Sequence, residues 1–304
     1  GGTRTFSQQT LASGAPFDLG FRNYMSMTNT TAGSTNTTDY VEVYHKIEAQ
    51  DVATSGWDYK SSNSYITISF WVRSSVAGTY TWWMRDEDAT SYTYAFNYTL
   101  ASNTWTKVTH SIPGHSGLVF NNDEGAGLRI QWMAYYGSNY CSASATLNAW
   151  STGPSLPIHD TTWNTTSNAT FDLTGVQLEA GDTATPFEHR SYGDELAKCQ
   201  RYFWRTTGDN YHGIGSGFVR TSSALRVVVA NPVEMRVAPT ASVSGEVRAA
   251  SGSITVGITV LDASWTGLRA SMLEFTHSGL TIGHGAIIHH KNNTTNYIQM
   301  DAEL

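Results

Sequence analysis

The 304-residue sequence has little charge and no long apolar run. Charged residues make up 14% of the chain, the formal net charge is -7, and Lys and Arg form no run. A protein of this kind is not expected to bind the backbone of a nucleic acid, and an anionic glycan is disfavoured as well. No apolar stretch approaches about 18 residues, so we expect no membrane insertion. Because Gly1 and Gly2 precede no signal-like apolar segment, we expect a trimmed, processed or partial chain.

Cysteine is also scarce. The two cysteines, Cys141 and Cys199, are too few for a disulfide framework. Cys199 falls on the apolar side of a predicted helix, which favours a buried free thiol.

Motifs of catalysis and of cofactor binding are missing. The sequence contains no P-loop, G-x-G-x-x-G or G-x-S-x-G motif. Asp160, Asp172 and Glu179 are carboxylates, but no spacing identifies an acid and nucleophile pair. The acidic tip Asp86 to Asp88 is typical of a solvated hairpin rather than of a calcium loop. We therefore predict a protein that is not an enzyme and has no cofactor.

What the sequence does contain favours β-structure. There are 10 Trp, 16 Tyr and 11 Phe, with many Thr, Ser and Asn residues and 27 Gly. Residues 1–38 are polar, and their one alternating patch is Phe17, Leu19 and Phe21. From there on, apolar residues alternate with polar ones in the segments 41–47, 66–72, 80–84, 92–98, 128–132 and 176–178. This period of two predicts a two-sheet antiparallel sandwich, and the lack of a fixed repeat disfavours a solenoid or propeller.

A short helix is predicted after this sandwich, at 191–205. Ser191 followed by Asp194 and Glu195 is typical of a helix N-terminus. Leu196, Cys199 and Phe203 are spaced i, i+3 and i+7, which gives one apolar stripe. Alternation resumes in 225–229 and 254–260, with further short strands near 268–275, 287–288 and 297–300. Residues 206–304 are therefore predicted to form a second, smaller β domain.

Three runs around this helix carry a family resemblance. VQLEAG at 176–181, ATPFEHRSYGDEL at 184–196 and CQRY at 199–202 resemble a signature common in phage tail-fibre and related virion proteins. ITISFWVRSS at 66–75 and NTWTKV at 103–108 fit the same pattern. The ending, from PVEMR at 232–236 to DAEL at 301–304, is similar to the terminal domain of such fibres.

The resemblance implies a fold and an assembly. It implies an all-β chain with an antiparallel jelly-roll domain at 1–190, similar to carbohydrate-binding modules, a linking α-helix at 191–205, and a C-terminal β-sandwich at 206–304. It also implies a homotrimer, with Leu196, Cys199 and Phe203 at the interface near the three-fold axis. Modules of this kind often hold a structural calcium through an aspartate of the last strand, but Thr174 and Gly175 stand there, so no metal is predicted.

The function that follows is host recognition by a virion protein. We expect a tail-fibre or spike component, on the exterior of a virion assembled in the cytoplasm of a bacterial host, with other virion proteins and a host surface glycan as partners. One alternative is a purely structural virion module, for capsid decoration or fibre building. Another is the carbohydrate-binding module of a polysaccharide-degrading system.

Aromatic residues out of phase with the core suggest where a glycan would bind. Trp71 and Trp83 alternate with apolar neighbours, so they should point away from the core, as Arg85 does. Tyr135 is out of phase with Ile130 and Trp132. We predict Trp71, Trp83, Arg85 and Tyr135 as ligand-binding residues, since sugars stack on aromatic rings. The alternative is that this face packs against loops or a neighbouring subunit.

Overall fold

The computed structural model describes residues 2–304 except 89–91, 144, 153–155, 159–160, 207–211 and 292–294. The chain divides into two compact units, Gly1–Glu188 and His189–Leu304. Both are built from antiparallel sheets, so the predicted all-β class is confirmed. Among the described residues, no helix has the length and apolar character needed to cross a bilayer.

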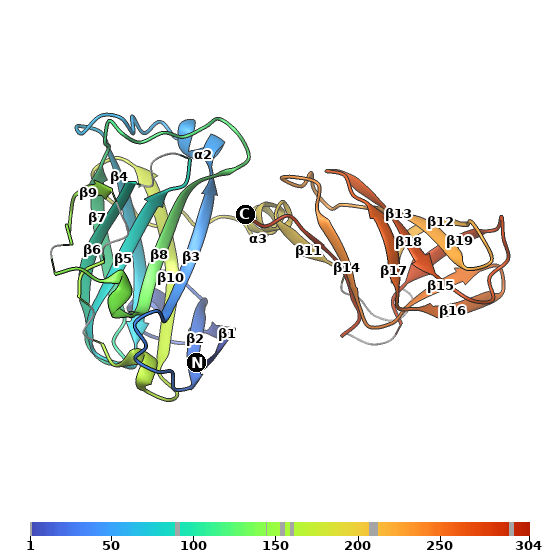
Figure 1. The fold of residues 1–304 in the computed structure, drawn as a ribbon, viewed down its shortest axis with the longest axis horizontal. Coiled ribbons are helices and arrows are strands. Elements are labelled where there is room, and N and C mark those ends of the chain that lie inside the picture. The colour runs from blue at the N-terminus through green and yellow to red at the C-terminus, as the bar shows by residue number, and fades with distance from the viewer. Residues whose placement is uncertain are drawn as a thin grey trace. The chain divides into compact units, whose positions relative to one another are not determined.

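The N-terminal unit is an antiparallel jelly-roll sandwich of two five-stranded sheets (Figure 1). Sheet 1 contains, in spatial order, β1 (Thr3–Thr10), β2 (Asn23–Thr31), β10 (Thr170–Ala180), β4 (Tyr65–Ser74) and β7 (Thr106–Pro113). Sheet 2 contains β3 (Tyr40–Glu48), β8 (Ala126–Tyr136), β5 (Gly78–Asp86), β6 (Tyr92–Leu100) and β9 (Trp150–Thr152). The short helices are α1 (Ala15–Asp18) and α2 (Ala49–Ala53), with 3-10 turns η1 (Ser138–Tyr140) and η2 (Trp163–Thr165).

Alternating residues from both sheets form the core between them. Ile68 and Phe70 of β4 are fully buried, as are Trp82 and Met84 of β5. Phe70 meets Trp132 of β8 edge to face, with ring centroids 5.5 Å apart. Each such side chain contributes about 1.5–3 kcal/mol through burial of its apolar surface.

Strands β1 and β2 lie in the polar segment 1–38 and were not predicted from the sequence. Nearly every side chain of β1 is exposed, so its sequence has no apolar face to detect. The strand forms because its backbone pairs with β2 over its whole length. Phe17, expected in an alternating patch, lies in helix α1 beside Pro16, whose fixed φ suits a first helical turn.

The predicted helix is present but shorter. Helix α3 spans Tyr192–Gln200, and the Ser191 hydroxyl accepts a hydrogen bond from the backbone N–H of Asp194 at 3.2 Å, which confirms the expected cap. Phe203 lies beyond the helix, in β11 (Phe203–Arg205), where it pairs with Asp301. The stripe of Leu196, Cys199 and Phe203 was therefore wrong as a single helical face.

Cys199 was predicted to be a buried thiol, and this prediction was wrong for the single chain. The thiol is free and the residue is exposed, and α3 has no buried residue.

The C-terminal unit contains a seven-stranded and a three-stranded sheet. The larger sheet has the order β16 (Ile254–Ile258), β15 (Val247–Ser251), β19 (Gly285–His289), β12 (Gly213–Val219), β13 (Ala224–Ala230), β18 (Ala270–Thr276) and β17 (Leu261–Trp265). The smaller sheet has the order β11, β20 (Tyr297–Asp301) and β14 (Thr240–Ser244). Leu273 and Phe275 of the larger sheet and Ile298 and Met300 of the smaller share one core.

Glu274 is a buried carboxylate on the other side of β18 from this core. Arg226 Nε donates to its Oε2 at 2.5 Å, and Arg220 Nη2 donates to its Oε1 at 3.1 Å. The hydrogen bond from Arg226 is the main cause of a lowered Glu274 pKa, with that from Arg220 adding to it.

Replacing Glu274 by Gln should make the C-terminal unit less stable at neutral pH, by about 1–2 kcal/mol for the lost charged hydrogen bonds. Because the folded pKa lies below the ordinary value of 4.5, this stabilisation is present above that value and disappears as pH falls through the folded pKa. Denaturant unfolding of both proteins between pH 7 and pH 3 should therefore show a difference that shrinks on acidification. A difference independent of pH would contradict the assignment.

Candidate functional site

A cavity of about 290 Å³ lies on the outer side of sheet 2. On β5, Trp82 and Met84 point into the core, so Trp83 and Arg85 point outward. Strand β8 lies between β3 and β5 (Figure 1). Trp83 of β5 pairs with Gln131 of β8, and Arg85 pairs with Arg129. We call this the sheet 2 cavity, and its lining residues are Tyr40, Glu42, Trp83, Arg85, Arg129, Gln131, Met133, Tyr140 and Leu156.

Trp83 forms part of the cavity wall but is not an exposed platform. Its exposed fraction is 8%, and it packs with Met133, Tyr136 and Leu156. The chain after β8 returns over this side of the sheet, where the backbone N–H of Leu156 donates to the carbonyl of Tyr140 at 2.9 Å. Trp83 thus points away from the core, as expected, but is covered as in the alternative that this face packs against loops. Alternation along a strand does not show which distant segment will cover its outer side.

The structure brings only two of the four predicted ligand-binding residues together. Trp83 and Arg85 both line the cavity. Trp71 points outward too, but from β4, which belongs to sheet 1, so it lies on the opposite side of the sandwich. The prediction of one common face was wrong, because alternation does not specify the sheet that a strand joins.

Tyr135 is absent from the cavity because of a β-bulge. Val41 pairs with Tyr135 and the next residue, Glu42, pairs with Met133, which leaves Ala134 as an extra residue on β8. The bulge changes the phase, so that Met133 and Tyr136 share the outer cluster, and Tyr135 is 8% exposed outside the cavity lining.

The charged groups of the cavity are already paired. Arg129 Nη2 donates to Glu42 at 2.5 Å, and the Gln131 amide donates to the other carboxylate oxygen of Glu42. Arg85 Nη2 lies 2.7 and 2.8 Å from the two Glu87 oxygens. Burial raises the pKa of Glu42, and the attraction of Arg129 and the hydrogen bond from Gln131 oppose this effect.

Three polar atoms of the lining residues have no hydrogen-bond partner among the described residues. They are Trp83 Nε1, Gln131 Oε1 and Arg129 Nε, and all three are shielded from bulk water. Gln131 itself is 1% exposed. An unsatisfied buried polar group costs about 1–3 kcal/mol, so these three atoms are candidates for contacts with a ligand. Gln131 and Arg129 were not predicted as functional residues, because nothing in their local sequence distinguishes them.

An aromatic side chain stands at the edge of the same cavity. Tyr40 is 56% exposed and meets Tyr140 edge to face with ring centroids 5.6 Å apart. A ring that is held in place yet accessible suits the apolar face of a sugar, while polar atoms nearby can fix its orientation.

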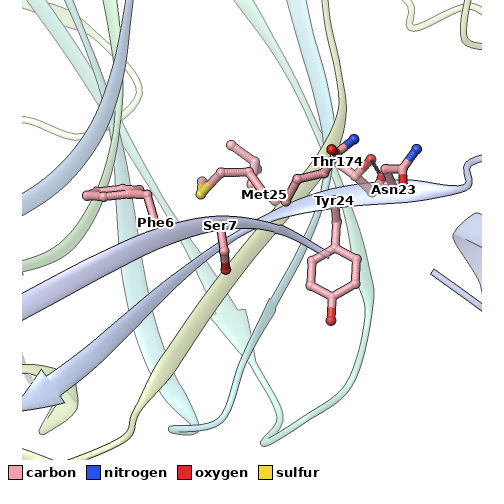
Figure 2. A pocket seen from close by; sticks show the side chains of 8 residues that line it. Phe6, Ser7, Asn23, Tyr24, Met25 and Thr174 are labelled. Carbon is pink, nitrogen blue, oxygen red and sulfur yellow. Dashed lines mark hydrogen bonds between the residues drawn. The ribbon is translucent and has the colours of Figure 1, made fainter. Parts of the chain in front are cut away.

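A second hollow, of about 450 Å³, lies at β1, β2 and β10. Figure 2 shows that its side chains do not converge: Phe6 and Met25 lie on one side of the strands, and Ser7 and Tyr24 point to the other. No described lining residue of this hollow has a buried polar atom without a partner. It is larger than the sheet 2 cavity but has fewer features of a ligand site.

The carboxylates considered for catalysis have structural partners. Asp172 accepts from Ser26 at 2.6 Å and from Arg73 Nη2 at 2.7 Å. Glu179 accepts from the backbone N–H and the hydroxyl of Thr185, at 2.9 and 2.7 Å. Asp160 lies outside the described residues. Among those that are described, no three His, Cys, Asp or Glu side chains are grouped to hold a metal ion.

Residues of the run at 176–181 make hydrogen bonds to neighbouring segments of the N-terminal unit. Gln177 Oε1 accepts from the backbone N–H of Glu188 at 2.8 Å, and the carbonyl of Gly181 accepts from the Thr67 hydroxyl at 2.7 Å. The signature residues thus hold the chain in place as it leaves β10, which is a structural role. Burial of Glu179 would raise its pKa, but the hydrogen bonds from Gln177 and Thr185 outweigh this and lower it.

Comparisons with known proteins do not assign this chain to a family. No family model and no curated protein matches the sequence. One matching structure is a candidate sugar-binding protein from Bacteroides thetaiotaomicron, with 8% identity, a TM-score of 0.30, and coverage of 59% of this chain and 83% of that one. Another is the family 11 carbohydrate-binding module of a Clostridium thermocellum cellulosomal cellulase, with 15% identity, a TM-score of 0.30, and coverage of 63% and 88%.

A third matching structure is the tandem family 22 carbohydrate-binding modules of a Paenibacillus barcinonensis protein, Xyn10C. It has 9% identity and a TM-score of 0.28, and the match covers 100% of this chain and 92% of that one. At these TM-scores the likenesses carry no argument about the function of this chain.

Replacing Trp83 by Ala should destabilise the N-terminal unit by about 3–5 kcal/mol, since the change empties a buried site. The matched control is Trp71→Ala on sheet 1, where the ring is only half-buried. The loss of stability caused by Trp71→Ala should be less than half of that caused by Trp83→Ala. Thermal or denaturant unfolding measures both, and equal losses would contradict the burial difference.

Proposed function

We propose that this protein binds carbohydrate in the sheet 2 cavity and does not change it covalently. The observation that carries the proposal is the group of three unpartnered polar atoms in the cavity lining, Trp83 Nε1, Gln131 Oε1 and Arg129 Nε. Sugar hydroxyls both donate and accept hydrogen bonds, so they can satisfy all three atoms. Tyr40 provides the ring on which an apolar sugar face can stack.

The wider role that we propose is host recognition by an exterior virion protein. Its support is the resemblance of residues 176–202 to the tail-fibre signature. In this role the protein is a tail-fibre or spike component that meets a host surface glycan and other virion proteins. The same cavity would serve equally well in a carbohydrate-binding module of a polysaccharide-degrading system, because sugar recognition there needs the same groups.

We also propose that the chain assembles as a homotrimer through α3. The helix has nine residues and none of them is buried, whereas isolated helices shorter than about 12–15 residues are marginal in water. Tyr192 is 81% exposed and Leu196 is 39% exposed. Packing against the same helix of neighbouring copies would cover these side chains and stabilise the helix.

Replacing Tyr40 by Ala should weaken glycan binding about tenfold or more, because a stacking aromatic is often a major contributor to affinity. The control is Tyr192→Ala, which removes another exposed tyrosine, from the C-terminal unit. Binding to glycan arrays and adsorption to susceptible cells measure the effect. Both variants should remain folded, since each side chain is largely exposed.

If the folded wild-type protein binds no glycan and no susceptible cell, the proposal fails. Equal binding by the Tyr40→Ala and wild-type proteins would place the glycan elsewhere on the molecule. Release of reducing sugar from a bound polysaccharide would refute the non-enzymatic part.

Replacing Leu196 by Asp should reduce the molar mass measured by light scattering from that of a trimer to that of a monomer, because a charge would enter the helix interface. Lys198→Asp introduces the same side chain on the opposite side of α3 and should leave the trimer intact. A monomeric wild-type protein would rule out the assembly.

A further inference from the structure

Gln131 lines the sheet 2 cavity and carries an acceptor atom without a partner among the described residues. The ionised Glu42 carboxylate can only accept, so the amide nitrogen of Gln131 must face it. This arrangement leaves Gln131 Oε1 without a partner among the described residues. A ligand that satisfies this oxygen has to donate a hydrogen bond.

Trp83 presents the complementary group. Its Nε1–H can only donate, and it too lacks a partner in the described structure. Trp83 and Gln131 are register partners on β5 and β8, so donor and acceptor come from directly opposite positions. A sugar hydroxyl can accept from Trp83 and donate to Gln131, whereas an ionised carboxylate can do only the first.

The paired charges of the cavity also disfavour an anion. Arg85 is held by both oxygens of Glu87, and Arg129 donates to Glu42. Among the buried guanidinium atoms of the described lining residues, Arg129 Nε is the one without a partner. A carboxylate ligand would therefore meet the Glu42 carboxylate, and both arginines that line the cavity already have a carboxylate partner.

From this arrangement we infer that the sheet 2 cavity selects a neutral sugar unit and discriminates against the corresponding uronic acid. The inference rests on the proposed carbohydrate binding. The cavity volume of about 290 Å³ is at the low end of ligand pockets, which span about 300–1,000 Å³, and suits one sugar unit rather than a longer segment.

The test uses the full chain and immobilised sugars in matched pairs, such as glucose with glucuronic acid and galactose with galacturonic acid. The neutral member of a bound pair should bind at least tenfold more tightly, and added salt should change its affinity little. Equal or tighter binding of the acid, weakened by salt, would overturn the selectivity and leave carbohydrate binding in place. If a folded protein binds no member of any pair or any other glycan, carbohydrate binding itself fails.

A variant pair tests the hydrogen bonds directly. Trp83→Phe keeps an aromatic ring but removes the Nε1–H, and it should weaken binding of the neutral sugar about threefold to tenfold. Trp71→Phe makes the same change outside the cavity and should leave affinity unchanged. Circular dichroism and the melting temperature confirm that both variants are folded.

Gln131→Met tests the acceptor, because it removes Oε1 and keeps a side chain of similar length. It should weaken binding of the neutral sugar about threefold to tenfold. Unchanged affinity in a folded Trp83→Phe protein would overturn the assigned hydroxyl contacts, and so would a folded Gln131→Met protein that binds as tightly as the wild type.

Discussion

Phe70 of sheet 1 meets Trp132 of sheet 2 edge to face, and Trp82 stands beside Trp132 with ring centroids 6.5 Å apart. This packing between the sheets determines the rest of the N-terminal unit. Once Trp82 and Trp132 are committed to the core, alternation sends Trp83 and Gln131 to the outer side. The chemistry of the outer cavity is therefore a consequence of the way in which the inner core is packed.

The cavity combines groups that stabilise it with groups that do not. The pairs of Arg129 with Glu42 and of Arg85 with Glu87 hold the long arginine side chains in place. The unpartnered atoms of Trp83, Gln131 and Arg129 work against stability, because each is buried without a hydrogen bond in the described structure. The larger hollow at β1, β2 and β10 has no such atom among its described lining residues, which distinguishes the two sites.

The sequence predicted much of the fold but less of the site. Segments with a clear alternation, such as 66–72 and 128–132, are strands β4 and β8, and the Ser191 cap is present. Strand β1 was missed because it is stabilised by backbone pairing rather than by an apolar face. Phe203 was wrongly placed on the helix, since helical spacing continues past Gln200 in the sequence while the chain itself becomes extended.

Alternation in the sequence alone determined that Trp71, Trp83 and Arg85 point away from the core, because the period of two is a local property of an extended chain. Only the tertiary structure decided that Trp71 belongs to sheet 1 and Trp83 to sheet 2, and that Leu156 packs against Trp83. It also decided the bulge at Ala134, which removes Tyr135 from the cavity. Strand pairing, loop coverage and bulges depend on contacts between residues far apart in the chain, and no local pattern records them.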